Sequence, residues 1–171
     1  MNEIMIFLIG LRGSGKTTVG HMLAERLALP FRDADAELEA RAGRGIAEIF
    51  STEGESAFRD LEEQTLVALI DSGSAVIATG GGVVLRESNR NRMKAAGTVV
   101  WLTADAETLW QRMNADPTSI QRRPNLASGG LAEVRETMRL RDPLYRSIAD
   151  ATVVTSDRSP EEIVADILAV C

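Results

Sequence analysis

Residues 10–17 read GLRGSGKT and match the pattern G-x-x-x-x-G-K-[ST] in full. An apolar run precedes this stretch, and an amphipathic helical pattern follows it. Glycines let the backbone wrap around an anion with its N–H groups turned inward, and the first turn of the following helix adds the positive end of its dipole. The stretch therefore predicts a loop that holds the phosphates of a nucleotide between a strand and a helix.

The polar side chains of this loop have predicted tasks. Lys16 can reach the β- and γ-phosphates, and Thr17 offers a hydroxyl to Mg²⁺. The motif alone does not separate a kinase from a GTPase, a motor or a passive nucleotide binder. The residues predicted to bind ATP at this loop are Gly10, Arg12, Gly13, Ser14, Gly15, Lys16, Thr17 and Thr18.

Short apolar runs recur along the chain and predict five buried strands, at residues 4–9, 31–34, 76–78, 98–102 and 151–154. Helical patterns alternate with them, at residues 16–28, 53–70, 87–96, 106–114, 131–149 and 161–170. This alternation predicts an α/β sandwich, with a parallel sheet covered on both faces and right-handed crossovers. Residues 115–130 contain two prolines and two glycines and show no period, so we expect a mobile loop there.

Length and charge limit the classes of protein. A chain of 171 residues suits a single domain, residues 1–171. A net charge of −6 argues against a general binder of nucleic acid or of an anionic membrane, but a local group of arginines is enough to bind a small anion. The single cysteine, Cys171, excludes a disulfide within the chain and is consistent with a reducing compartment. We expect a cytoplasmic protein, and nothing in the sequence demands more than a monomer.

Two carboxylates follow the second predicted strand. Asp33 and Asp35 stand two residues apart, which would turn both side chains to the same face and toward the crevice of the phosphate loop. One carboxylate can hold Mg²⁺, which prefers oxygen ligands, and the other can accept the proton of an attacking hydroxyl or orient it. The alternative is a solvated turn in which Asp35 caps the next helix.

Residues on either side of the third predicted strand are candidates for binding an acceptor. Arg59 and Glu62 can pair across one turn of a predicted helix. They form either a surface ion pair worth about 0.5 kcal/mol, or a pair in which Glu62 holds Arg59 in a fixed pose for a carboxylate ligand. Three glycines, residues 80–82, follow the strand. Either a ligand approaches their bare backbone or the loop is a tight turn, and the place at a strand end favours the ligand.

Two arginines in the C-terminal half are candidate anion ligands. Arg123 lies in the predicted mobile loop, where it can close over a γ-phosphoryl group and stabilise its developing charge, or belong to a solvated basic turn. Arg141 lies on the predicted helix after that loop and is either a second clamp for an anion or a surface charge.

In their order and spacing, these motifs resemble those of the shikimate kinase family over nearly the whole chain. The family shows a phosphate loop, D-x-D, G-E-x-x-F-R-x-x-E, G-G-G, an R-P lid motif and R-x-P-L-Y. They stand here as GLRGSGKT at 10–17, DAD at 33–35, GESAFRDLE at 54–62, GGG at 80–82, RP at 123–124 and RDPLY at 141–145. The resemblance implies a P-loop NTPase type of fold, a five-stranded parallel sheet of order 2-3-1-4-5, similar to nucleoside monophosphate kinases.

The resemblance also implies an activity, in which ATP passes its γ-phosphate to the 3-hydroxyl of shikimate on the way to chorismate and the aromatic amino acids. Asp35 would contact the shikimate hydroxyls as base or orienting group, and Asp33 would support Mg²⁺ with Thr17. Lys16 and Arg123 would neutralise the transferring phosphoryl group, so the implied catalytic residues are Asp35, Lys16 and Arg123. The implied shikimate ligands are Asp35, Arg59, Gly80, Gly81, Gly82 and Arg141.

The resemblance assigns residues 115–130 to a lid and about residues 35–62 to the acceptor-binding region. The chain departs from the family in the lid, where many members read R-P-L-L and this chain has Asn125 after the proline. Many members also carry an arginine seven residues before the R-P motif, stacked on adenine, whereas this chain has Asp116 there. The candidates for the adenine side are then Arg112 and Arg158.

Two alternative functions stay open on the sequence. The chain could be another small-metabolite kinase of the same fold, of the gluconate or nucleoside monophosphate type, although a nucleotide acceptor needs a phosphate clamp and a base pocket. It could also be a non-catalytic regulatory module that binds ATP. In such a module the two aspartates would only bind the metal, and the residues on the acceptor side would have no function.

Overall fold

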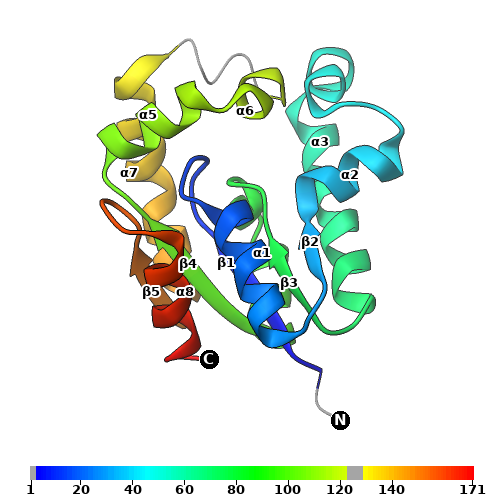
Figure 1. Cartoon of the computed structure of the whole chain (residues 1–171). Helices are drawn as coiled ribbons and strands as arrows, with labels where there is room; N and C mark the ends of the chain where they lie inside the picture. Colours follow the sequence, from blue (N-terminus) through cyan, green and yellow to red (C-terminus); the bar gives the residue numbers. More distant parts are fainter. Residues whose placement is uncertain (1–2, 123–128) are drawn as a thin grey trace.

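The computed structural model describes residues 3–122 and 129–171, with a five-stranded sheet at its centre (Figure 1). The strands are β1 (Met5–Ile9), β2 (Phe31–Asp33), β3 (Ala75–Ala78), β4 (Thr98–Thr103) and β5 (Ala151–Val154). Their order is β2-β3-β1-β4-β5, and every neighbouring pair is parallel. The predicted strands agree with these bounds to within one residue, and the predicted fold class and strand order are confirmed.

Helices cover both faces of the sheet and give the fold three layers. On one face lie α1 (Lys16–Leu27) and α8 (Pro160–Leu168). On the other face lie α3 (Ile46–Asp71), α4 (Glu87–Ala96), α5 (Ala106–Ala115), α7 (Gly130–Ile148) and the short 3₁₀ helix η1 (Val83–Leu85). In the part of the chain that the structure describes, no helix is both long and apolar enough to span a membrane.

The alternation of side chains in the central strand produces two apolar clusters. In β1, Ile6 and Leu8 pack with the residues of α1 and α8, whereas Phe7 and Ile9 pack with those of the opposite helical layer. All five residues of β1 are buried. A strand that is covered on both faces needs an apolar side chain at every position, which explains the near-continuous apolar run in the sequence.

Two helices near β2 differ from the prediction. α2 (Ala34–Ala42) lies where no helix is predicted, because Leu38 is its one buried residue and its apolar period is weak. α3 begins at Ile46 rather than at residue 53. Gly54, with φ 85° and ψ 178°, interrupts α3, so two helical segments join there.

A further helix, α6 (Pro117–Arg122), occupies the first part of the loop predicted at residues 115–130, and that part of the prediction is wrong. Asp116 Oδ1 accepts a hydrogen bond from the backbone N–H of Thr118 at 3.0 Å. Pro117 stands at the first helical position, where the N–H it lacks has no intrahelical partner, so the proline begins a helix here instead of breaking one. Residues 123–128 of the predicted lid, with Arg123, lie outside the described residues, and α7 already begins at Gly130.

Candidate active site

A pocket of about 360 Å³ opens where β1, β2 and β3 end, the edge at which open parallel sheets bind ligands. Its lining includes residues 12, 13 and 15–18, Asp33, Asp35, Gly80 and Gly81. Thr79 Oγ1 donates to the carbonyl oxygen of Leu8 at 3.0 Å and ties the end of β3 to β1. The structure thus brings most of the nucleotide candidates to one pocket, together with Asp35, Gly80 and Gly81 of the acceptor candidates, whereas Arg59, Gly82 and Arg141 do not line it.

The phosphate loop has the backbone that its glycines require. Gly10 has φ 144°, and a Cβ at this position would lie 2.2 Å from the carbonyl oxygen of Leu102, so only glycine fits. Lys16 Nζ donates to the carbonyl oxygens of Gly10 and Leu11 at 2.7 and 3.0 Å. Its ammonium group therefore lies inside the curve of the loop. Gly10 and Ser14 are buried and shape the loop without lining the pocket.

Asp33 and Asp35 both line the pocket, but the geometry differs from the predicted one. The chain turns into α2 at Ala34, so Asp35 stands in the first turn of a helix and not on the same face of a strand as Asp33. The capping residue is Asp33, whose Oδ1 accepts from Ala36 N at 3.0 Å, and the alternative that Asp35 caps the helix is wrong. A carboxylate in the first turn of a helix is stabilised by the helix dipole.

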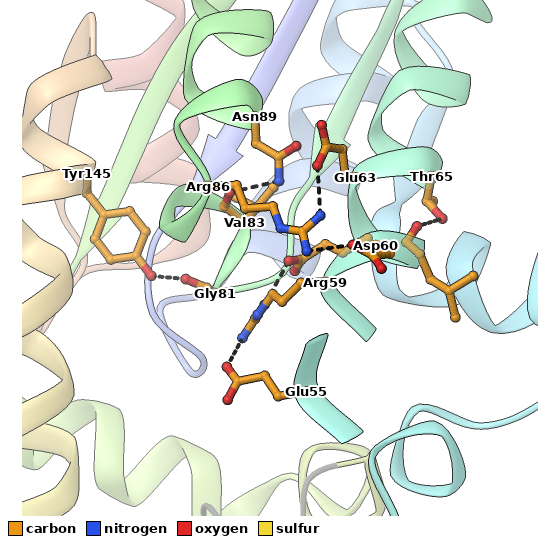
Figure 2. Close-up of polar contacts among 12 residues, drawn as sticks. Glu55, Arg59, Asp60, Glu63, Thr65, Gly81, Val83, Arg86, Asn89 and Tyr145 are labelled. Carbon is orange, nitrogen blue, oxygen red and sulfur yellow. Dashed lines mark hydrogen bonds and ion pairs between the residues drawn. The ribbon is translucent and has the colours of Figure 1, made fainter. Parts of the chain in front are cut away.

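Arg59 and Glu62 form a buried ion pair on α3, so the surface-pair interpretation is wrong. Their residues are 8% and 5% exposed, and Arg59 Nη1 donates to Glu62 Oε2 at 2.7 Å. Arg59 Nη2 also reaches Glu55 Oε1 at 3.4 Å (Figure 2). A Cβ on Gly82 would lie 2.3 Å from Arg59 Nη1, so the guanidinium group lies directly against the bare backbone of the glycine loop. Position 82 therefore requires glycine, because the guanidinium group of Arg59 leaves no room for a side chain there.

The glycine loop is both a wall of the pocket and a turn. Val83 N donates to the carbonyl oxygen of Gly80 at 3.1 Å, which begins η1. The hydroxyl of Tyr145, on α7, donates to the carbonyl oxygen of Gly81, as Figure 2 shows. Arg141 lies one helical turn before Tyr145, and its Nη1 is 3.5 Å from the position of a Cβ on Gly81. Arg59 and Arg141 therefore contact neighbouring glycines of one loop.

Charged residues fix this loop to α3. Arg86, just after η1, donates to Glu63 Oε2 at 2.8 Å and to Asp60 Oδ1 at 2.6 Å (Figure 2). Arg92 donates to the other carboxylate oxygen of Glu63 at 2.5 Å. The hydrogen bond from Arg86, followed by that from Arg92, lowers the pKa of Glu63 to about 2, so this carboxylate is ionised at neutral pH. The register of α3 against the glycine loop is thus held by charge-assisted hydrogen bonds.

Three further predicted arginines differ in where they lie relative to the pocket: Arg112, Arg158 and Arg141. Arg112 lines the pocket and donates to the carbonyl oxygen of Gly13 at 3.2 Å and to that of Thr155 at 2.9 Å, so it braces the phosphate loop. Arg158 lies outside the pocket lining and pairs with Asp166 at 2.7 Å. Arg141 lies outside the lining of this pocket and lines a smaller cavity of about 40 Å³, which shares Arg12 and Gly81 with it.

Five pocket residues were not predicted: Ala78 and Thr79 at the end of β3, and Asp116, Thr118 and Arg122, which line the wall formed by the end of α5 and by α6. The last three were missed because their segment has no apolar period and was assigned to a loop. The Asp-Pro step at residues 116–117 is the one signal that could have indicated a helix start.

The donor set near the phosphate loop fits Mg²⁺. Thr17 and Asp33 both line the pocket and offer a hydroxyl and a carboxylate, which are oxygen ligands. Within residues 3–122 and 129–171, no group of three or more histidine, cysteine, aspartate and glutamate side chains could enclose a metal ion. Mg²⁺ in kinases needs no such group, because one or two protein ligands, water and the phosphates complete its shell.

Comparisons with known proteins agree on one family. A family model described as shikimate kinase matches residues 12–171. The shikimate kinase of Rhodopirellula baltica is 43% identical over 164 residues, covering 95% of this chain and 88% of that protein. A solved structure of shikimate kinase from Acinetobacter baumannii in complex with shikimate is 38% identical, with a TM-score of 0.90 and 97% and 91% of the two chains covered. A gluconokinase from Sinorhizobium meliloti, 20% identical with a TM-score of 0.61 over 98% of this chain and 91% of that one, shares the fold alone.

Proposed function

The chain belongs to the shikimate kinase family and is a kinase that phosphorylates shikimate with ATP, and from this premise we propose how its residues carry out the transfer. The γ-phosphoryl group passes to the 3-hydroxyl and gives shikimate 3-phosphate and ADP. The observation that carries the proposal is that a single pocket joins the phosphate loop to Asp35, with the buried Arg59 behind its glycine wall. The proposal treats residues 1–171 as one kinase domain.

The nucleotide side of the pocket holds and neutralises phosphates. Backbone N–H groups of the phosphate loop and of the first turn of α1 would bind the phosphates, and Lys16 would leave its loop carbonyls to contact the transferring group. Thr17 and Asp33 would hold Mg²⁺, which supplies positive charge to the β- and γ-phosphates. In-line transfer needs little covalent help from the protein, so positioning and charge supply most of the rate.

The acceptor side fixes shikimate at both ends. Arg59 and Arg141 hold its carboxylate through guanidinium groups, which bind carboxylates with two directed hydrogen bonds. The buried Glu62 keeps Arg59 in one orientation, and the guanidinium groups of Arg59 and Arg141 lie beside the neighbouring glycines Gly82 and Gly81. Asp35 then orients the attacking hydroxyl or accepts its proton.

Two further assignments complete the nucleotide side. Arg112 and Arg158 are proposed on the side of the adenine, supported for Arg112 by its place in the pocket wall. Arg123 is proposed to neutralise the phosphoryl group in the transition state. This role remains a prediction from the sequence, since Arg123 lies outside the described residues. We also propose a cytoplasmic monomer, because the sequence has one cysteine and none of its features demands a second chain.

A screen of acceptors tests the function. With ATP and Mg²⁺, shikimate is expected to release ADP and yield a phosphorylated product in equal amounts, while gluconate and AMP give no product above the no-acceptor rate. The carboxylate clamp is the reason, because AMP needs a base pocket and a phosphate clamp. Coupled ADP release together with mass spectrometry of the product measures both quantities. Transfer to gluconate or AMP in preference to shikimate, or ATP binding without transfer to any of them, would overturn the assignment.

Gly82→Ala tests the carboxylate clamp. The new methyl group would lie 2.3 Å from Arg59 Nη1, so the guanidinium group has to move while Glu62 still holds its other side. We expect KM for shikimate to rise about 30-fold, the worth of one charge-assisted hydrogen bond, with KM for ATP nearly unchanged. Gly45→Ala is the comparison, since this residue lies outside the pocket lining and its Cβ would meet its nearest neighbour, Glu39 Oε1, at 3.8 Å. Equal effects of the two substitutions would separate Arg59 from acceptor binding.

A further inference from the structure

An ion pair joins two walls of the pocket that lie far apart in the sequence. Arg122, on α6, donates from Nε and Nη2 to Glu39 Oε2 at 3.1 and 3.0 Å. The two side chains are 25% and 26% exposed, so the pair is partly shielded from water. The other oxygen of Glu39, Oε1, accepts from the backbone N–H of Ile46 at 3.1 Å, at the start of α3. Glu39 therefore connects α2 with both α3 and α6.

Helical spacing shows how this pair relates to the pocket. Asp35 and Glu39 are four residues apart on α2 and share one face of that helix, as Thr118 and Arg122 do on α6. Asp35, Thr118 and Arg122 all line the pocket. The two helix faces therefore bound the same space, and the ion pair joins them one turn beyond Asp35. Figure 1 shows α6 extending from the end of α5 toward α3, on the side of the sheet edge where the pocket lies.

We infer that the Glu39–Arg122 ion pair is a strap, named the α2–α6 strap, that positions the α6 wall against the helix carrying Asp35 and so retains shikimate and excludes water during transfer. The inference rests on the proposed role of Asp35. Pro117, Thr118, Ile120 and Gln121 of α6 are exposed, so little burial holds this helix in place without the strap. A wall that moves away admits water to the phosphoryl group, and water then competes with the 3-hydroxyl as acceptor.

Glu39→Gln tests the strap. The amide keeps a carbonyl oxygen for Ile46 N–H and removes the charge that faces Arg122. We expect KM for shikimate to rise about 5- to 10-fold and the ratio of ADP released to shikimate phosphorylated to rise above one, as one partly shielded ion pair is lost. KM for ATP should stay within about 2-fold of that of the unmodified chain. KM for shikimate should also rise with salt more steeply in the unmodified chain than in Glu39→Gln, because ions screen the pair in addition to the carboxylate clamp, which both proteins keep.

Glu136→Gln is the matched control. Arg139 donates from the same two nitrogens, Nε and Nη2, to Glu136 Oε2 and Oε1 at 2.9 and 2.7 Å, on the exposed surface of α7 and outside the pocket. Arg122→Gln removes the other partner of the strap and leaves the hydrogen bond between Glu39 and Ile46 intact. It therefore tests the strap independently if Glu39→Gln lowers the melting temperature of the protein. The double variant Glu39→Gln/Arg122→Gln should be no worse than the worse single variant, since one interaction is lost in all three.

Three outcomes would overturn the strap: Glu39→Gln matching Glu136→Gln in KM and in the ADP ratio, additive effects in the double variant, or a rise in KM for ATP alone. These results are distinct from a failure of the proposed function, which would show as absent shikimate phosphorylation in the unmodified chain.

Discussion

Asp35→Asn is expected to lower kcat for shikimate phosphorylation about 10³-fold, in the range found when a positioned general base or orienting carboxylate is removed. Asparagine has nearly the same shape, so the first turn of α2 and the lining of the pocket should persist. It cannot take a proton, and it brings N–H donors toward a hydroxyl that must itself donate. KM for ATP should change little, because Asp35 is on the acceptor side of the pocket. Steady-state kinetics with each substrate varied in turn separate the two effects.

Glu37→Gln is the control for Asp35→Asn. Glu37 is in the same first turn of α2 and outside the pocket lining, so its removal costs the same favourable interaction with the helix dipole. Its kinetics should stay close to those of the unmodified chain. A loss of kcat in Glu37→Gln as large as in Asp35→Asn would assign the effect to α2 itself and remove Asp35 from the chemistry.

The phosphate loop and the sheet could be predicted from the sequence because local rules decide them. At Gly10 any side chain would collide with the carbonyl oxygen of Leu102, so the backbone of the loop requires this glycine. The glycine in the motif therefore predicts the backbone conformation. The strands are recognisable because both faces of the sheet are covered and every position must be apolar. The order of the strands came from the resemblance to a family, since periodicity alone does not tell which strand lies in the middle.

The acceptor side was harder to predict because distance in sequence separates its parts. In the sequence, the Arg59–Glu62 pair looked like any exposed pair at helical spacing. Its burial depends on Gly82, which the chain after β3 brings beside α3. Likewise, no local pattern connects Glu39 with Arg122. The short helices α2 and α6 were missed because each has too few buried residues for a period. Asp33 and Asp35 do line the predicted pocket, but because they lie at the N-cap and in the first turn of α2, and not because they alternate along a strand.

Lys16→Met is expected to lower kcat about 10³-fold at saturating ATP, because one fixed positive charge beside the transferring phosphoryl group is lost. Methionine keeps the unbranched stem and favours a helix, so α1 should still begin at residue 16. The lost contacts are with the backbone carbonyls of Gly10 and Leu11, so the apolar side chain of Leu11 should keep its place in the core. KM for shikimate should stay close to its value in the unmodified chain, since the carboxylate clamp is untouched.

The sequence offers one matched control for this change, because it contains only two lysines. Lys94, in the last turn of α4, is exposed and outside the pocket, so Lys94→Met removes the same charge from the chain without touching the phosphates. Its kcat should equal that of the unmodified chain within about 2-fold. The contrary outcome is that Lys16→Met keeps most of its kcat and only binds ATP more weakly. Lys16 would then stabilise bound ATP and the transition state equally. The positive charge that stabilises the transition state would have to come from the arginines.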